Sequence, residues 1–279
     1  MAVWAGREER LAGVEKDWIF VADAHLTGRA PEEMAAFVRF LDRERPRMGH
    51  LVVLGDLFEF FFGFKKSYGS PDEKSFAFPE YLPVLNKLLA LHREGIRIKY
   101  FEGNHDFSLH SYFRERLGMN VEVYPGGREE RLEGKRAFLA HGDLSNPGQW
   151  KYRFLRRMVK NRLTYGLIQL AGPRLSRRVA DWMSGKSYGL YHGALPEPPP
   201  AFRAFARRKF QEGFEVVVLG HSHFPDEFVE EIEGRRHLYF NVGDWMIHRS
   251  FLRFSPPEMF QLSRFDDKSE SSDDREMRR

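Results

Sequence analysis

Residues 100–107 read YFEGNHDF: an apolar run stops and is followed by a glycine, an amide, an imidazole and a carboxylate. Short unbroken apolar runs are typical of β-strands that are buried on both faces. Four further runs end in the same way. The polar residues after the five runs are Asp23 and His25; Asp56; Asn104, His105 and Asp106; His141; and His221 and His223. Because ligands of layered α/β folds bind beyond the carboxyl ends of the strands, we expect these side chains to share one site.

The order of the apolar runs predicts an α/β fold. Segments with helical patterns, at 31–45 and 80–95, lie between the early runs, and this alternation indicates helices layered on sheet. The segments 226–245 and 249–265 are typical of hairpins, so we expect the chain to finish in antiparallel strands. The predicted buried strands are WIFVA (18–22), LVVL (51–54), IRIKYF (96–101), AFLA (137–140), EVVVL (215–219) and LYFNV (238–242).

The composition excludes sites that need cysteine, and the absence of long apolar stretches favours a cytoplasmic location. The chain has 279 residues and no cysteine, which excludes disulfides, thiolate metal ligands and cysteine nucleophiles. The first 17 residues are charged and lack the apolar stretch of a signal peptide. No run approaches the roughly 18 apolar residues that can span a bilayer. We therefore expect a cytoplasmic protein.

Positive charge is concentrated in one segment. Residues 146–195 hold ten Lys and Arg and one acid, a net charge of +9, whereas the whole chain has +4, which leaves −5 for the rest. A basic segment on an acidic body indicates an anionic partner at that place, unless it is simply a solvated helix face.

The side chains at the strand ends are suited to metal ions. Carboxylates, imidazoles and amide oxygens bind divalent ions such as Mn²⁺, Fe²⁺ or Zn²⁺. One shared carboxylate can bridge two ions.

In this order, the motifs Asp-x-His, Gly-Asp, Gly-Asn-His-Asp, His-Gly-Asp and Gly-His-x-His resemble those of the calcineurin-like metallophosphoesterases, over roughly residues 17–245. The resemblance implies a four-layer αββα sandwich with a site for two metals at the sheet edge. It assigns each polar residue a role. Asp23, His25 and His223 would bind the first metal, Asp56 would bridge both, and Asn104, His141 and His221 would complete the second.

The same resemblance implies the chemistry. A hydroxide that bridges two divalent ions would attack phosphorus, with Mn²⁺ as the implied metal and Fe or Zn as alternatives. His105 would be the catalytic histidine that protonates or stabilises the leaving oxygen, and Asp106 the carboxylate that orients it. The alternative for His105 is a supporting role without contact to substrate.

Three stretches are similar to a narrower group, the UDP-2,3-diacylglucosamine diphosphatases of lipid A synthesis. They are VLGDLFEFFFG (53–63), DAHLTG (23–28) and GMNV (118–121), and the basic insertion also follows the His-Gly-Asp motif as in that group. This similarity implies cleavage of the pyrophosphate to UMP and 2,3-diacylglucosamine 1-phosphate (lipid X). One departure is the third motif, which reads Gly-Asn-Arg-Asp in the best-known branch. The alternative is a phosphoesterase for another phosphodiester or pyrophosphate, such as a nucleotide or phospholipid.

We expect residues 146–200 to form a helical cap that is inserted within a single domain spanning residues 1–265. Segments 149–172 and 173–185 have helical periodicity, with Arg153, Arg156, Arg157 and Lys160 on one side of the first helix and Trp150, Phe154 and Met158 on another. Such helices suit an anionic membrane surface, so we expect peripheral association with the inner membrane. The alternative is a helical hairpin packed on the core with solvated arginines.

Three further expectations rest on charge and composition. Lys151, Arg157 and Lys186 are candidate substrate contacts. Phe60, Phe61, Phe62 and Phe64 would form either the opposite lip of an acyl-chain pocket or part of the core. The tail 266–279 is polar and expected to be disordered. No nucleic-acid partner is expected, because the basic block is interleaved with apolar residues.

Overall fold

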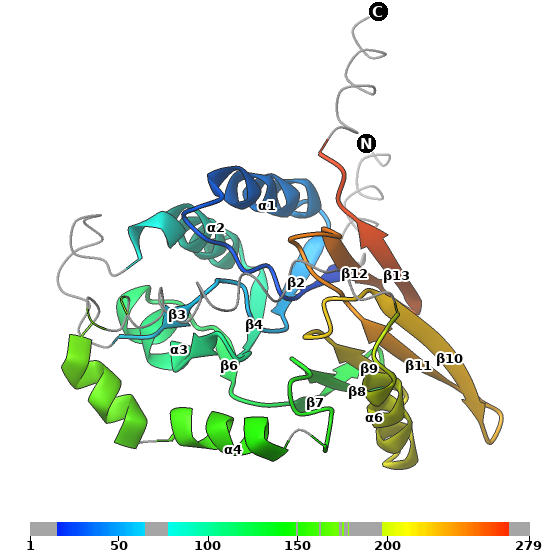
Figure 1. The fold of residues 1–279 in the computed structure, drawn as a ribbon. Helices are drawn as coiled ribbons and strands as arrows, with labels where there is room; N and C mark the ends of the chain where they lie inside the picture. Colours follow the sequence, from blue (N-terminus) through cyan, green and yellow to red (C-terminus); the bar gives the residue numbers. More distant parts are fainter. Residues whose placement is uncertain are drawn as a thin grey trace, which may run out of the picture.

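The computed structural model describes residues 16–64, 78–148, 150–161, 163–172, 175, 178 and 197–267. Two large sheets form its centre (Figure 1). The first has six strands in the order β13-β12-β1-β2-β4-β6, and β1, β2, β4 and β6 run parallel. Its strands are β1 (Asp17–Val21), β2 (Met48–Val53), β4 (Arg97–Phe101), β6 (Glu122–Tyr124), β12 (Ser250–Ser255) and β13 (Met259–Arg264).

The second sheet has five strands in the order β10-β11-β9-β8-β7. The central strand β9 pairs in parallel with β8 and β11. The edge strands β7 and β10 form antiparallel hairpins with β8 and β11, respectively. A short pair, β3 (Phe61–Phe62) and β5 (Asp106–Phe107), forms a separate ribbon beside the first sheet. The five strands are β7 (Arg128–Leu132), β8 (Lys135–Ala140), β9 (Val216–Leu219), β10 (Asp226–Ile232) and β11 (Arg235–Asn241).

Helices cover the outer faces of both sheets, which gives four layers (Figure 1). Helices α1 (Pro31–Glu44) and α2 (Leu82–Arg93) pack on the first sheet through a core that includes Phe37 and Leu88. Helix α6 (Pro200–Gln211) packs on the second through Phe202 and Phe210. Between the sheets lies a separate apolar core. Its members include Phe20, Val52, Leu139, Val218 and Leu252. The predicted αββα sandwich is therefore confirmed, as are the six buried strands, the two helices and the two hairpins.

The remaining short helices are a 3₁₀ turn at Pro79–Tyr81, α3 (Leu109–Ser111) and a π-helical turn at Tyr112–Arg116. In the described part of the chain, no helix has the length and apolar character required to cross a membrane.

The insertion contains helix α4 (Trp150–Val159), followed by a second helical stretch at 163–172. The single helix predicted over 149–172 is thus wrong, and Asn161 explains the break. Its Oδ1 accepts the backbone N–H of Thr164 at 2.9 Å, and its carbonyl accepts that of Tyr165, which makes Asn161 the N-cap of the second stretch. The predicted helix over 173–185 lies almost wholly outside the described residues.

The phenylalanines at 60–64 belong to the core. Phe61 is fully buried among the rings of Phe58, Tyr81 and Tyr112, at centroid distances of 5.0–6.0 Å. The rings of Phe62 and Phe64 are buried as well, and Phe60 packs on the same cluster. Of the two expectations for this segment, the structure supports the core rather than an exposed lip.

Residues 266 and 267 are fixed by contacts to α1. Arg39 of α1 donates from Nε to Oδ1 of Asp267 at 2.8 Å, and Arg43 donates to the carbonyl of Asp266. The predicted disorder from residue 266 is therefore wrong for these two residues, and residues 268–279 lie outside the described part.

Candidate metal centre

The polar residues after the strands have an unusual backbone. Five of them adopt positive φ, between 42° and 66°, a region that residues with a side chain rarely occupy. Each such residue costs of order 1–3 kcal/mol, and strain of this kind clusters at functional sites. The five are Asp23, His25, Asp56, His221 and His223.

Asp56 occupies the centre of the cluster. Its Oδ1 accepts the backbone N–H of His105 at 2.8 Å, which fixes the carboxylate. The other oxygen, Oδ2, lies 4.0 Å from Nε2 of His25 and 3.4 Å from Nε2 of His141. A Cβ on Gly103 would come within 2.0 Å of Oδ1, so only glycine permits this approach. One oxygen of Asp56 therefore faces two groups of imidazoles at once.

The first group consists of Asp23, His25 and His223. Asp23 accepts the N–H of His221 at Oδ2, at 2.6 Å, and turns Oδ1 toward Nε2 of His223 at 3.6 Å and of His25 at 4.0 Å. Oδ1 of Asp23 and Nε2 of His25 are buried and have no hydrogen-bond partner. Two buried polar atoms that face each other without a partner fit a cation between them.

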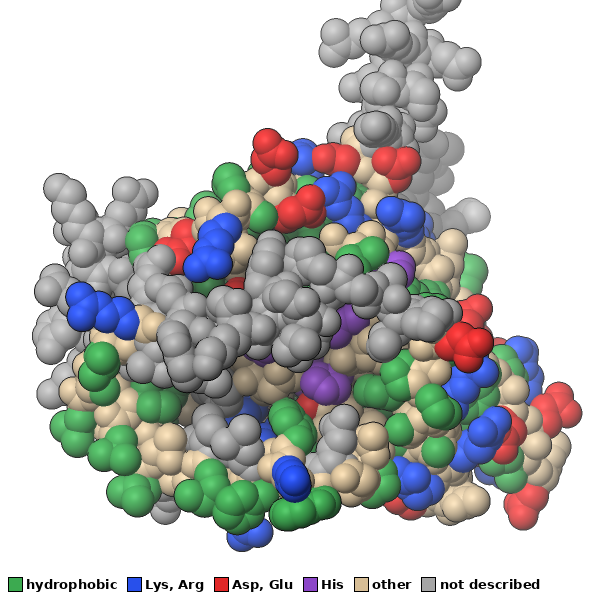
Figure 2. Space-filling model, in the orientation of Figure 1, with side chains coloured by type: hydrophobic (Ala, Val, Ile, Leu, Met, Phe, Trp, Pro, Cys, Tyr) green, Lys and Arg blue, Asp and Glu red, His purple; other side chains and the backbone are tan. Residues whose placement is uncertain are grey.

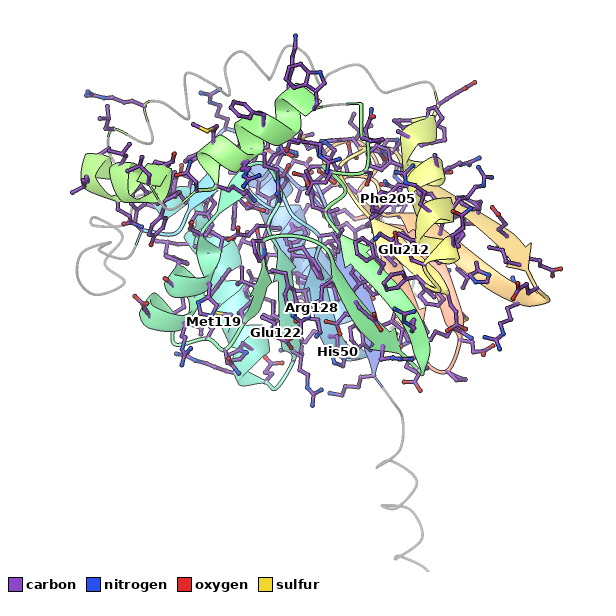
Figure 3. All side chains as sticks on the ribbon, turned by 90° about the horizontal axis from the view of Figure 1, so that it is seen from below. His50, Met119, Glu122, Arg128, Phe205 and Glu212 are labelled. Atoms are coloured by element: carbon purple, nitrogen blue, oxygen red, sulfur yellow. The ribbon has the colours of Figure 1, made fainter. Side chains whose placement is uncertain are left out.

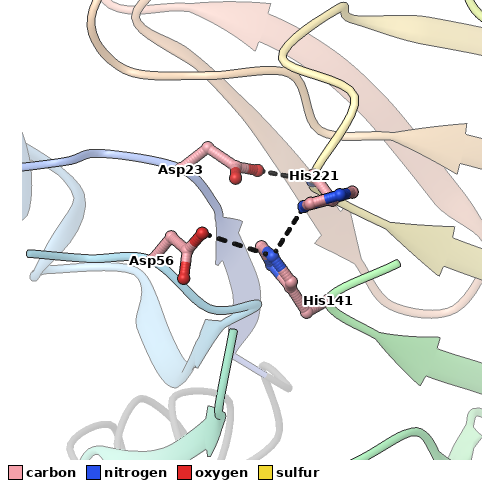
Figure 4. Close-up of side chains that lie close together, drawn as sticks. All are labelled: Asp23, Asp56, His141 and His221. Carbon is pink, nitrogen blue, oxygen red and sulfur yellow. Dashed lines mark hydrogen bonds and ion pairs between the residues drawn. The ribbon is translucent and has the colours of Figure 1, made fainter. Parts of the chain in front are cut away.

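The second group surrounds His141 (Figure 4). Nδ1 of His141 donates to the carbonyl of Leu54 at 2.7 Å, which leaves the lone pair of Nε2 for the site. Nε2 lies 3.0 Å from Oδ1 of Asn104 and 3.0 Å from Nδ1 of His221. The structure thus brings all seven predicted ligands together. Asp23 contacts both groups, whereas the resemblance assigned it to the first alone. Oδ2 of Asp56 lies within 4.0 Å of one histidine of each group, so the bridging role of Asp56 stays a prediction.

Two acids that the sequence interpretation missed hold the histidines of the first group. Oε2 of Glu59 lies 3.3 Å from Nδ1 of His25, and Oδ2 of Asp244 lies 3.5 Å from Nδ1 of His223. Each contact turns Nε2 of its histidine toward the site. Asp244 follows a glycine at the end of an apolar run, as Asp56 does, so the same signal could have revealed it.

His105 lies beside the first group, but Asp106 does not orient it. The rings of His105 and His25 meet edge to face at 4.8 Å, and Nδ1 of His105 donates to the carbonyl of Glu59 at 2.6 Å. Asp106 is buried and accepts the hydroxyl of Tyr100 at 3.0 Å. Burial and the charge of Asp56 raise the pKa of Asp106 well above its usual range. The predicted role of Asp106 is therefore wrong: Glu59 fixes the ring of His105.

The two histidines of the second group have pKa values shifted in opposite directions. Burial works against a charge on His141, but Asp56 and Asp23 outweigh burial and raise its pKa to about 10. Burial and His141 lower the pKa of His221 to about 3. Bound divalent cations would neutralise these carboxylates in place of a proton on His141, and the lone pair of Nε2 would then be available to an ion. The donor set of oxygens and imidazole nitrogens fits such ions.

The basic residues of α4, and Lys160 directly after it, divide between contacts to the body and exposure to solvent. Arg156 and Lys160 turn inward and contact the loops of the site, whereas Arg153 and Arg157 are exposed. Lys151 is exposed and its ammonium lies 5.7 Å from the ring centroid of Trp150. The structure does not bring Lys151 or Arg157 to the seven ligands by any hydrogen bond or ion pair, and Lys186 lies outside the described residues.

Comparison with known proteins identifies relatives. Three curated relatives are each called UDP-2,3-diacylglucosamine hydrolase. The protein from Aeromonas salmonicida is 32% identical and is matched over 86% of this chain and 90% of its own length. That from Aeromonas hydrophila is 30% identical (86% and 95%), and that from Yersinia pseudotuberculosis 32% (84% and 93%).

Residues 19–225, about three quarters of the chain, match the family described as calcineurin-like phosphoesterase. The match spans all five motifs, and the cluster around Asp56 indicates a binuclear metal site. By its sequence and by the geometry of this site, the chain belongs to the calcineurin-like phosphoesterase family.

Proposed function

We propose that this hydrolase cleaves the pyrophosphate of UDP-2,3-diacylglucosamine to UMP and 2,3-diacylglucosamine 1-phosphate, with two Mn²⁺ ions. The observation that carries the proposal is the match to UDP-2,3-diacylglucosamine hydrolases over 84–86% of this chain and at least 90% of theirs. When bound, two divalent cations neutralise charge on phosphoryl oxygens and make a water molecule nucleophilic near neutral pH.

The side chains of the site divide the remaining tasks. Asn104 offers an amide oxygen without adding negative charge. Because Nδ1 of His105 is held by the carbonyl of Glu59, the proton that this ring can transfer is the one on Nε2. His105 would give that proton to the leaving phosphate oxygen as the bond to phosphorus breaks.

A cleft of about 540 Å³ beside the metal centre offers room for part of the substrate. Small-molecule sites typically have volumes of roughly 300–1,000 Å³. Residues His141, Asp143, Arg156, Phe205 and Arg208 are among those that line it.

The experiment that tests this proposal compares substrates. The Mn²⁺-loaded protein in detergent is given UDP-2,3-diacylglucosamine, bis-p-nitrophenyl phosphate or a cyclic nucleotide. We expect UMP release at least about 10²-fold faster than turnover of the other two, because a substrate that fills its site gains rate from remote binding energy. Turnover of the generic esters with an inert lipid would contradict the lipid substrate and favour the alternative of another phosphodiester.

We further propose that the insertion rests on an anionic membrane surface. An apolar stripe, between 51% and 85% exposed, runs along the outer side of the insertion. Figure 2 shows hydrophobic side chains gathered over α4 and the stretch that follows it. On α4, Lys151 flanks the stripe on one side and Arg153 and Arg157 on the other, as a helix at a charged interface requires. The stripe consists of Trp150, Phe154, Met158, Leu163, Leu167 and Leu170.

Replacing Trp150 and Phe154 together by serine should weaken binding to vesicles that contain phosphatidylglycerol by about tenfold or more, because each aromatic ring loses burial worth about 1.5–3 kcal/mol. Cosedimentation measures the binding, and hydrolysis of bis-p-nitrophenyl phosphate should be unchanged. Met259→Ser is the matched control, since Met259 is 59% exposed on β13. Equal vesicle binding by the wild type and the double variant would exclude the stripe as the membrane contact.

A further inference from the structure

Lys160, the residue directly after α4, contacts the loop that carries Asn104. Nζ of Lys160 donates to the carbonyl of Gly103 at 2.7 Å and lies 3.7 Å from Oε2 of Glu102. The side chain of Lys160 is only 12% exposed, although it carries a charge. Burying a lysine to this degree costs free energy of desolvation, and the contacts to Gly103 and Glu102 offset that cost.

The carbonyl that Lys160 holds belongs to the peptide that packs on Asp56. Gly103 lies so close to Oδ1 of Asp56 that a Cβ at this position would not fit. Two residues later, the backbone N–H of His105 donates to the same oxygen. Asn104 lies between these two anchored residues. Fixing the Gly103 carbonyl therefore fixes Asn104 relative to Asp56.

A second set of contacts reaches the loop that carries His141. Nε of Arg156 lies 2.5 Å from Oδ2 of Asp143, which also accepts the hydroxyl of Tyr152 at 2.8 Å. Asp143 is buried and follows His141 by two residues. The ring of Tyr152 also lies 6.4 Å from that of His221. Lys160, Arg156 and Tyr152 therefore contact the loops or side chains of the three residues predicted to complete the second metal site. These three are Asn104, His141 and His221.

Helix α4 covers the site end of the two sheets, whereas His50 and Glu122 lie at the opposite end (Figure 3). We infer that α4 is a structural part of the second metal subsite, with Lys160 and Arg156 as positioning residues for Asn104 and His141. Docking of α4 and binding of the second ion are then coupled, and the coupling is reciprocal: each favours the other by the same factor. The inference rests on the two-metal assignment and is independent of the lipid substrate.

The test measures Mn²⁺ binding to the full chain by isothermal titration calorimetry, so that it does not depend on any substrate. Lys160→Met and Arg156→Met should each raise the Kd of the second ion by about 10–100-fold, the usual cost of removing a group that positions a metal ligand. The Kd of the first ion should stay within about threefold of the wild-type value.

Lys160→Arg keeps a donor at this position and should restore most of the affinity for the second ion. In the wild type, Mn²⁺ should slow amide hydrogen exchange over 150–160, and Lys160→Met should abolish this protection.

Lys87→Met is the matched control. Lys87 is also 12% exposed and also pairs with a carboxylate, that of Asp42, but it lies on α2. Two Mn²⁺ bound with wild-type affinities in both Lys160→Met and Arg156→Met would overturn the inference. So would equal weakening of both ions, or the same weakening by Lys87→Met, because either result indicates general destabilisation. If Lys160→Met does not fold, Arg156→Met makes the same comparison on its own.

Discussion

Asp56→Asn is expected to lower kcat/KM by about 10³-fold or more. The Asn side chain can still accept the N–H of His105 through its oxygen, so its NH₂ group would replace Oδ2 between His25 and His141. Both predicted ion positions then lose the charge that they share. Loss of several kcal/mol of charge stabilisation corresponds to about three decades in rate.

The measurement is hydrolysis of bis-p-nitrophenyl phosphate at saturating Mn²⁺, with bound metal counted by mass spectrometry. Glu44→Gln is the control, because Glu44 is a buried carboxylate on α1 that pairs with Arg43 and Arg253, away from the site. Unchanged thermal unfolding separates loss of metal from loss of fold. Activity of Asp56→Asn within tenfold of the wild type would contradict a bridging role.

His105→Gln is expected to lower kcat by about 10²–10³-fold while both ions stay bound. A positioned general acid contributes roughly 10²–10⁴-fold, and His105 is not among the seven predicted ligands. The glutamine side chain cannot transfer a proton. The loss should therefore be larger for esters whose leaving group is a poor one.

Phosphodiesters with phenyl and p-nitrophenyl leaving groups measure this difference, since nitrophenolate leaves without protonation. We expect a loss at least about tenfold larger for the phenyl ester. An equal loss for both esters would indicate that His105 only supports the site, and weakened Mn²⁺ binding would make it a ligand of the first group.

The sequence predicts the catalytic edge well because its signals are local. Each predicted ligand follows closely on a short apolar run, and buried parallel strands bring their carboxyl ends to one edge of the sheet. Asp23 and Asp56 could therefore be placed together although 33 positions separate them. The layered fold follows from the same runs and from the helices between them.

Other features depend on contacts that no local pattern contains. The amphipathic pattern of α4 defines a basic and an apolar side, but it does not say which side faces the body. The acceptors that draw Arg156 and Lys160 inward, Asp143 and the Gly103 carbonyl, come from other loops. For the same reason the partner of His105 is a backbone carbonyl, that of Glu59, instead of the adjacent carboxylate of Asp106.

A crystal structure of the protein with Mn²⁺ bound would show whether two cations share Asp56. Anomalous scattering locates Mn²⁺ without assumptions about chemistry. We predict two peaks on either side of Asp56, one among Asp23, His25 and His223 and the other among the remaining ligands. A single peak, or two peaks that do not share Asp56, would exclude a bridging role for Asp56.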